Sequence, residues 1–114
     1  MRRPLIVAAL LAAAPFAAQA ENLVVYTSQP NEDAQATIDA FMAANPDVQV
    51  EWVRDGTTKI MARLRAEFEA DAPQPDVLFI ADMVTMEGLK REGRLMAHPG
   101  ADVSAYPAGL HDPE

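Results

Sequence analysis

Apolar residues along the chain form three short runs, and each run is followed by a polar loop and then by a helical pattern. Residues 23–26 are continuously apolar and include two valines, which is typical of a strand covered on both faces. Residues 48–53 alternate between apolar and polar side chains, as in a half-exposed strand. Residues 76–81 contain a second continuous apolar run, which begins directly after Asp76. The pattern predicts two interior strands and one strand nearer a sheet edge.

The segments between and after these runs have apolar residues at helical spacing and predict helices over 31–45, 58–70 and 83–92. The second helix has the clearest apolar stripe, made of Ile60, Met61, Leu64 and Phe68.

Residues that start and stop helices stand at the expected ends. Asp55-Gly56 predicts a turn, after which Thr57 or Thr58 is positioned to cap the second helix. Asp82 is the predicted N-cap of the third helix, and Gly93 its C-terminal stop.

This order of strands and helices predicts the α/β class, because alternating strands and helices form a parallel sheet with flanking helices. A sheet order of 2-1-3 places the first strand in the centre and the alternating strand at an edge. The third strand, being continuously apolar, then requires a further neighbour that the sequence does not obviously supply.

The N-terminus has the pattern of a secretory signal peptide. Arg2 and Arg3 precede an apolar run that ends in Ala18-Gln19-Ala20, a small-x-small cleavage pattern. We expect cleavage between Ala20 and Glu21, and a bacterial periplasm as the destination. The apolar run is too short for a comfortable membrane anchor.

Charge and composition narrow the functions further. Residues 21–114 contain 7 basic and 17 acidic side chains, a net charge of −10, which argues against a nucleic-acid partner. The chain has no cysteine, no phosphate-binding loop and no nucleophile elbow, so no cofactor is expected and no enzymatic activity is indicated. His98 and His111 lack metal-ligand spacing, so we predict no resident metal.

Three polar clusters follow the three predicted strands and are the candidate binding residues. Because the carboxyl ends of parallel strands meet at one edge, these clusters should converge there. Hydroxyls and helix N-terminal amides suit an anion, whereas the carboxylates suit an amine or a metal. Each residue taken singly also fits an ordinary cap or turn. The candidates are Thr27, Ser28 and Gln29; Asp55, Gly56, Thr57 and Thr58; and Asp82.

The order of these motifs resembles a known family. The relevant segments are Leu-Val-Val-Tyr-Thr-Ser-Gln at 23–29, Val-Arg-Asp-Gly-Thr-Thr at 53–58, Pro-Asp-Val-Leu-Phe-Ile-Ala-Asp at 75–82 and Gly-Leu-Lys-Arg-Glu-Gly-Arg-Leu at 88–95. They are similar to the N-terminal part of periplasmic solute-binding proteins of ABC importers, in the branch that includes ferric-iron, polyamine, thiamine and phosphonate binders.

The resemblance implies a protein of the periplasmic-binding-protein type II fold, whose two lobes close on a small-molecule or metal-complex solute and deliver it to an inner-membrane ABC permease. It places the three polar clusters in the cleft. We expect a signal peptide at 1–20, part of the first lobe at 21–97 and an irregular Pro-rich tail at 98–114.

Two departures from the family pattern bear on the ligand and on the length. Ferric-iron binders carry a histidine in the first cleft loop and a glutamate in the third, where this chain has Pro30 and Ala81. The chain is also far shorter than family members, so a truncated product, a split reading frame or a partial record is expected. The alternative hypotheses are a fragment of an exported α/β enzyme, with Ser28 as its only well-placed nucleophile, and a non-functional remnant.

Overall fold

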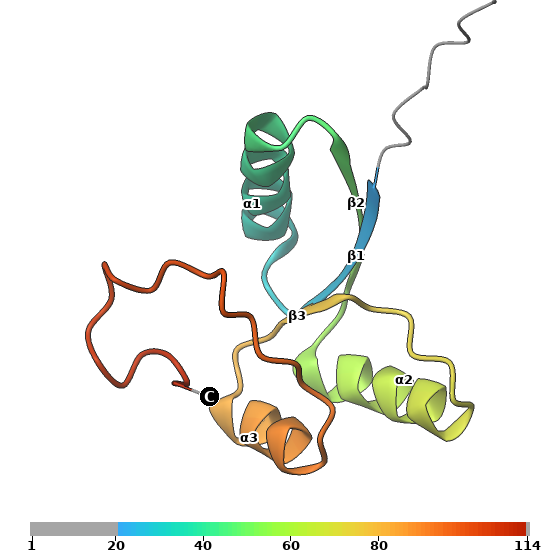
Figure 1. The fold of residues 1–114 in the computed structure, drawn as a ribbon. Coiled ribbons are helices and arrows are strands. Elements are labelled where there is room, and N and C mark those ends of the chain that lie inside the picture. Colours follow the sequence, from blue (N-terminus) through green and yellow to red (C-terminus); the bar gives the residue numbers. More distant parts are fainter. Residues whose placement is uncertain (1–20, 114) are drawn as a thin grey trace, which may run out of the picture.

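A computed structural model describes residues 21–113, and it has the predicted α/β fold (Figure 1). Three strands, β1 (Glu21–Thr27), β2 (Val48–Arg54) and β3 (Val77–Phe79), form one parallel sheet in the order β2-β1-β3. The predicted order 2-1-3 is therefore confirmed. The predicted signal peptide, including Ala20 at the expected cleavage point, lies outside the described residues.

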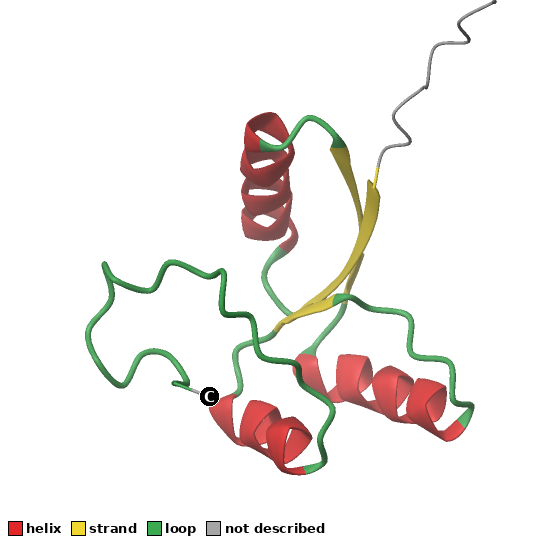
Figure 2. Ribbon diagram, viewed as in Figure 1, coloured by secondary structure: helices red, strands yellow, loops and turns green. Residues whose placement is uncertain are grey.

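The helices are α1 (Asn31–Ala44), α2 (Thr57–Glu69) and α3 (Met83–Arg91), and their bounds agree with the sequence prediction to within one residue (Figure 2). α1 lies on one side of the sheet, and α2 and α3 lie on the other (Figure 1). Gly93 follows α3 with a φ of 68°, a left-handed conformation that glycine adopts without strain, so the predicted helix stop is confirmed.

The core is built where β1 meets α2 and α3. Tyr26 at the centre of the sheet is fully buried and faces these helices, while Val25, whose side chain points to the opposite face, is 8% exposed. Met61 and Leu64 of α2 pack with Leu89 of α3. Residues Phe68, Leu78, Ile80 and Met86 pack around this cluster. The helical periodicity of the sequence therefore becomes a buried layer on this side of the sheet.

The expectation that the third strand is interior is not met within residues 21–113. β3 is only three residues long and forms one edge of the sheet, with Val77 41% and Phe79 45% exposed. Its start is tied to β1 because Asp76 N–H donates to the carbonyl of Val24 at 2.8 Å, and the Asp76 carboxylate accepts from Val24 N–H at 2.8 Å. An apolar run predicts a strand, but its burial depends on the neighbour that covers it.

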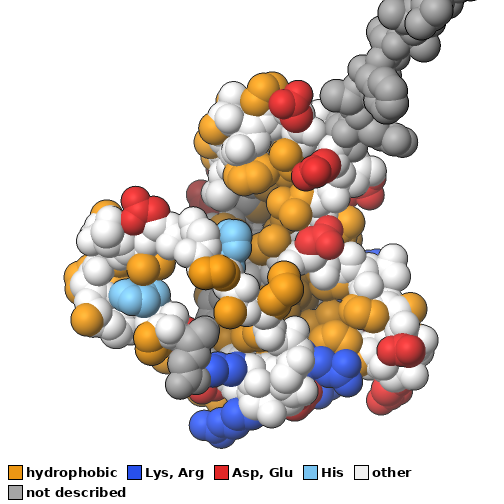
Figure 3. Space-filling model, viewed as in Figure 1, with side chains coloured by type: hydrophobic (Ala, Val, Ile, Leu, Met, Phe, Trp, Pro, Cys, Tyr) orange, Lys and Arg blue, Asp and Glu red, His pale blue; other side chains and the backbone are white. Residues whose placement is uncertain are grey.

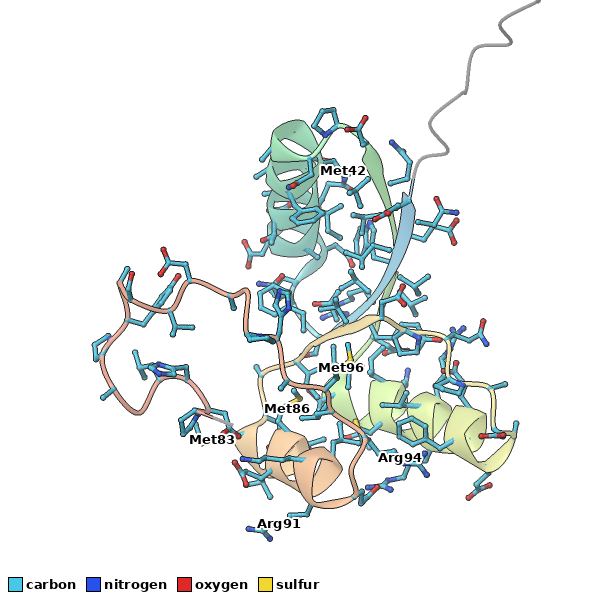
Figure 4. The ribbon with its side chains drawn as sticks, in the orientation of Figure 1. Met42, Met83, Met86, Arg91, Arg94 and Met96 are labelled. Carbon is cyan, nitrogen blue, oxygen red and sulfur yellow. The ribbon has the colours of Figure 1, made fainter. Side chains whose placement is uncertain are left out.

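After α3 the chain has neither helix nor strand in residues 95–113. A groove of about 970 Å³ lies between this segment, β3, α1 and α2, and its lining includes Phe41, Phe68 and Val77. Figure 3 shows hydrophobic side chains gathered between α1 and α2 on the face in view. Met86 and Met96 also line the groove and lie on the α3 side of β3 (Figure 4).

Candidate functional site

The first predicted cluster forms the loop that leaves β1. Thr27 is the last residue of β1 and is only 1% exposed. Its Oγ1 accepts a hydrogen bond from the backbone N–H of Gln29 at 3.1 Å. Thr27 therefore shapes the loop from beneath, because its side chain has almost no surface left for a ligand.

Ser28 joins this loop to the end of β3. Its backbone N–H donates to the carbonyl of Phe79 at 3.1 Å, and its Oγ accepts from the N–H of Ala81 at 3.2 Å. The first and third predicted clusters are consequently held side by side. This arrangement follows from the β1–β3 register, in which Thr27 pairs with Phe79.

The loop after β2 reaches the same place. Asp55 N–H donates to the carbonyl of Thr27 at 3.2 Å, and Arg54 Nε donates to the carbonyl of Gln29 at 2.8 Å. All three loops are thus linked through residues 27–29, so the expected convergence at the carboxyl edge of the sheet is present in the structure.

The start of α2 differs from the prediction. Its N-cap is Gly56, and neither Thr57 nor Thr58 caps it, because α2 already begins at Thr57. The Asp55 carboxylate accepts from Gly56 N–H at 2.8 Å and lies 3.6 Å from Lys59 Nζ. No side chain caps this helix and its first turn has no acidic residue, so the Asp55 carboxylate directly before the helix is the negative charge beside its N-terminus among these residues.

Asp82 caps α3, as predicted. Its Oδ1 accepts from the N–H groups of Val84 at 3.1 Å and Thr85 at 3.3 Å, and its Oδ2 accepts from the Thr85 hydroxyl. The hydroxyl of Thr85, followed by the backbone N–H groups, lowers the pKa of Asp82 below its ordinary value. The carboxylate is therefore ionised and fully engaged with the helix, which leaves it little capacity for a further partner.

Sequence reasoning missed two features of this edge. Arg54 was not among the candidates, although it occupies the last position of β2 and its side chain reaches the loop after β1. The side-chain Oε1 of Gln29 is buried and accepts no hydrogen bond from the residues that the structure describes. A cationic residue at the carboxyl end of a strand is the only signal in the sequence that could have drawn attention to Arg54.

Other kinds of site find no support in the described part of the chain. Within residues 21–113 no three His, Cys, Asp or Glu side chains gather as a metal site would require. None of the helices there has the length and apolar character needed to cross a membrane. Ser28, the nucleophile of the enzyme alternative, has no hydrogen bond to a histidine among these residues.

A comparison with protein families supplies the decisive observation. Residues 13–112 match the model of the bacterial extracellular solute-binding protein family. The chain belongs to this family. No curated protein matches the sequence. The match spans every strand and helix described above, so the converging loops belong to a solute-binding protein.

Membership has direct consequences for function. Proteins of this family are extracellular solute-binding components of transporters, which bind a small solute and work with a membrane permease, and they are generally not enzymes. The resemblance expected from the sequence is confirmed at the level of the family.

Proposed function

We propose that the chain is a periplasmic solute-binding component of an ABC importer, and that it holds its solute at the carboxyl edge of the sheet. The observation that carries the proposal is the linkage of three loops through residues 27–29. In open α/β sheets, ligands bind beyond the carboxyl ends of the strands, where helix N-termini point. The solute is a small organic molecule or a metal complex such as chelated iron, as in the branch that includes ferric-iron, polyamine, thiamine and phosphonate binders.

The roles of the candidate residues divide by the hydrogen bonds that their side chains make. Thr27, Ser28 and Asp82 position the loops, since their side-chain oxygens are engaged with the protein. The surface that meets the solute is formed by Gln29, Asp55, Gly56, Thr57 and Thr58. Thr57 is half-buried at the first position of α2, and Thr58 is exposed beside it.

Export completes the proposal. The Arg2-Arg3 pair, the apolar run and Ala18-Gln19-Ala20 direct the chain through the inner membrane, and cleavage leaves Glu21 as the first residue. N-terminal sequencing of the protein from the periplasm tests this step. A mature chain that retained Leu5 would contradict it.

Calorimetry of the full chain against ferric citrate, spermidine, thiamine and aminoethylphosphonate tests the solute site. For whichever solute binds, Thr57→Ala should weaken binding by roughly 0.5–1.5 kcal/mol, the net value of a typical hydrogen bond. Thr37→Ala is the matched control, because the Thr37 hydroxyl donates to Asp33 O on the exposed surface of α1. Equal affinities for both variants and the parent chain would place the solute elsewhere.

A further inference from the structure

Arg54 is a cation held in a fixed position at the carboxyl edge. It is the last residue of β2, its side chain is exposed, and its Nε donates to the carbonyl of Gln29 at 2.8 Å. The guanidinium group is planar and rigid, so a hydrogen bond through Nε also orients the two terminal nitrogens. Within residues 21–113 no carboxylate forms an ion pair with Arg54, and no acceptor is recorded for its terminal nitrogens.

The surroundings of Arg54 contain backbone donors and one carboxylate that is already engaged, that of Asp55. The chain as a whole has a formal net charge of −8, and the first turn of α2 carries no acidic residue and no side-chain cap, but the Asp55 carboxylate directly before it accepts from Gly56 N–H and lies 3.6 Å from Lys59 Nζ. The amide hydrogens at the start of this helix add a partial positive charge at the same edge. The site therefore combines a positioned guanidinium with backbone donors in an otherwise acidic protein.

Lys59, the other cation near this edge, is differently arranged. It lies in the first turns of α2, its side chain is 78% exposed, and its Nζ is 3.6 Å from the Asp55 carboxylate. A flexible ammonium that is already paired and almost fully solvated contributes little to recognition. Arg54 is thus the better-defined cationic group of the site.

We propose that Arg54 binds an oxyanion of the solute, a carboxylate or a phosphate, through its terminal nitrogens. The inference rests on the proposed solute site. It adds the charge class of the solute and the residue that binds the charged group. Guanidinium groups bind carboxylate and phosphate with two parallel hydrogen bonds, a geometry that the ammonium of lysine lacks.

Nuclear magnetic resonance of the ¹⁵N-labelled full chain tests this binding directly. Inorganic phosphate and citrate are titrated separately, to distinguish a phosphate from a carboxylate, and spermidine and thiamine serve as non-anionic solutes. We expect at least one of the two anions to shift the Arg54 Nε–H and the Thr57 and Thr58 amide signals in a saturable way. Arg54→Gln should weaken that binding at least about tenfold, and Arg54→Lys should restore only part of it.

Arg91→Gln is the matched control, because it removes the same charge from the end of α3, where Arg91 projects away from the sheet (Figure 4). It should leave the anion affinity unchanged within about twofold, as expected for an exposed charge that makes no contact with the ligand. A thermal melt of each variant separates loss of binding from loss of the Arg54–Gln29 contact.

The proposal about Arg54 is overturned if neither anion gives a saturable shift, or if Arg54→Gln binds the anion as tightly as Arg91→Gln does. Binding of spermidine or thiamine that Thr57→Ala weakens and Arg54→Gln leaves intact would keep the solute site and remove only the role of Arg54. Anion binding that requires Arg54 supports both proposals together.

Discussion

The core between the sheet and helices α2 and α3 is packed very differently from the β3 edge. Toward α2 and α3, the side chains of Tyr26, Leu64 and Leu89 are at most 1% exposed. At the β3 edge and on the facing side of α1, Val77 and Phe41 are each 41% exposed. The difference lies in what covers each surface. Two helices close over the first, whereas α1 packs on the other face of the sheet through Ala34 and Ile38 but leaves the β3 edge open within residues 21–113 (Figure 1).

This comparison shows where the stability of the described part resides. Burial removes apolar area from water, so a leucine between α2 and α3 contributes far more than an equally apolar residue at the β3 edge. The carboxyl-edge loops are attached to both regions, since Ser28 bonds to the end of β3 while Tyr26, two residues earlier, lies at the centre of the core.

The largest expected effect is on the covered side. Leu64→Ala should lower the free energy of unfolding by roughly 2–5 kcal/mol, because Leu64 is 1% exposed and its removal leaves a cavity in the α2–α3 layer. Leu95, which follows α3, is 39% exposed and serves as the partly exposed leucine for comparison. Leu95→Ala should cost about 1 kcal/mol or less, in proportion to the area it buries. Urea unfolding followed by circular dichroism measures the free energy of unfolding of both variants. Equal losses would contradict the difference in packing between the two regions.

A polar cluster on the same side gives the next largest effect. The Glu67 Oε1 accepts from the Tyr26 hydroxyl at 2.6 Å and from Arg63 Nε at 3.0 Å, and its Oε2 accepts from Gln74 N–H at 3.1 Å. Glu67→Gln should therefore lower the free energy of unfolding by roughly 1–3 kcal/mol at neutral pH, the range for hydrogen bonds to a charged group. Chemical denaturation of the variant and the parent chain at pH 7 gives the value.

The same cluster should make stability depend on acid. Burial by itself raises the pKa of Glu67, but the hydrogen bonds from Tyr26, Arg63 and Gln74 outweigh it and hold the pKa below its ordinary value of 4.5. A carboxyl group with a lowered pKa in the folded state stabilises the fold above its unfolded pKa, and this contribution is lost as pH falls through the folded pKa. The difference between parent and Glu67→Gln should accordingly shrink below about pH 4.5. A constant difference down to pH 3 would contradict this.

The regular elements could be predicted because local patterns decide them. The helical stripe at Ile60, Met61 and Leu64 predicted α2, and all three residues are buried. The alternation in β2 predicted its place at a sheet edge, which the order β2-β1-β3 confirms.

One miss concerns a choice between neighbouring residues, and the others concern contacts between residues far apart in the sequence. Gly56 takes the cap position because α2 starts one residue earlier than expected, and the sequence offers three suitable residues in a row. Arg54 reaches Gln29 only through the register that pairs Thr27 with Arg54, and no local pattern encodes that register. The exposure of Val77 and Phe79 likewise depends on covering neighbours, which an apolar run cannot reveal.

Loss of a helix cap should have an intermediate effect. Asp82→Ala removes the acceptor for two N–H groups of α3 and should lower the free energy of unfolding by about 0.5–2 kcal/mol. It should also speed amide hydrogen exchange in the first turn of α3. Later in the same helix, Leu89 packs into the core. Asp102 makes a similar bond to Ser104 N–H at 3.0 Å, but in the irregular segment. Asp102→Ala should change the free energy by less than about 0.5 kcal/mol, as exposed substitutions do.

The smallest expected effect is at the β3 edge, where the register offers a matched pair. Val25 and Val77 lie side by side in β1 and β3, but Val25 is 8% exposed and Val77 is 41% exposed. Replacing valine by threonine keeps the shape and adds a hydroxyl, which costs roughly 1–3 kcal/mol where it is buried without a partner. Val77→Thr should therefore change the free energy of unfolding by less than about 0.5 kcal/mol, whereas Val25→Thr should show the full cost. Urea unfolding of both variants at several protein concentrations makes the comparison. Similar, large losses for the two would mean that the outer side of β3 is covered in solution, and that the contrast between the core and the β3 edge is smaller than these exposures indicate.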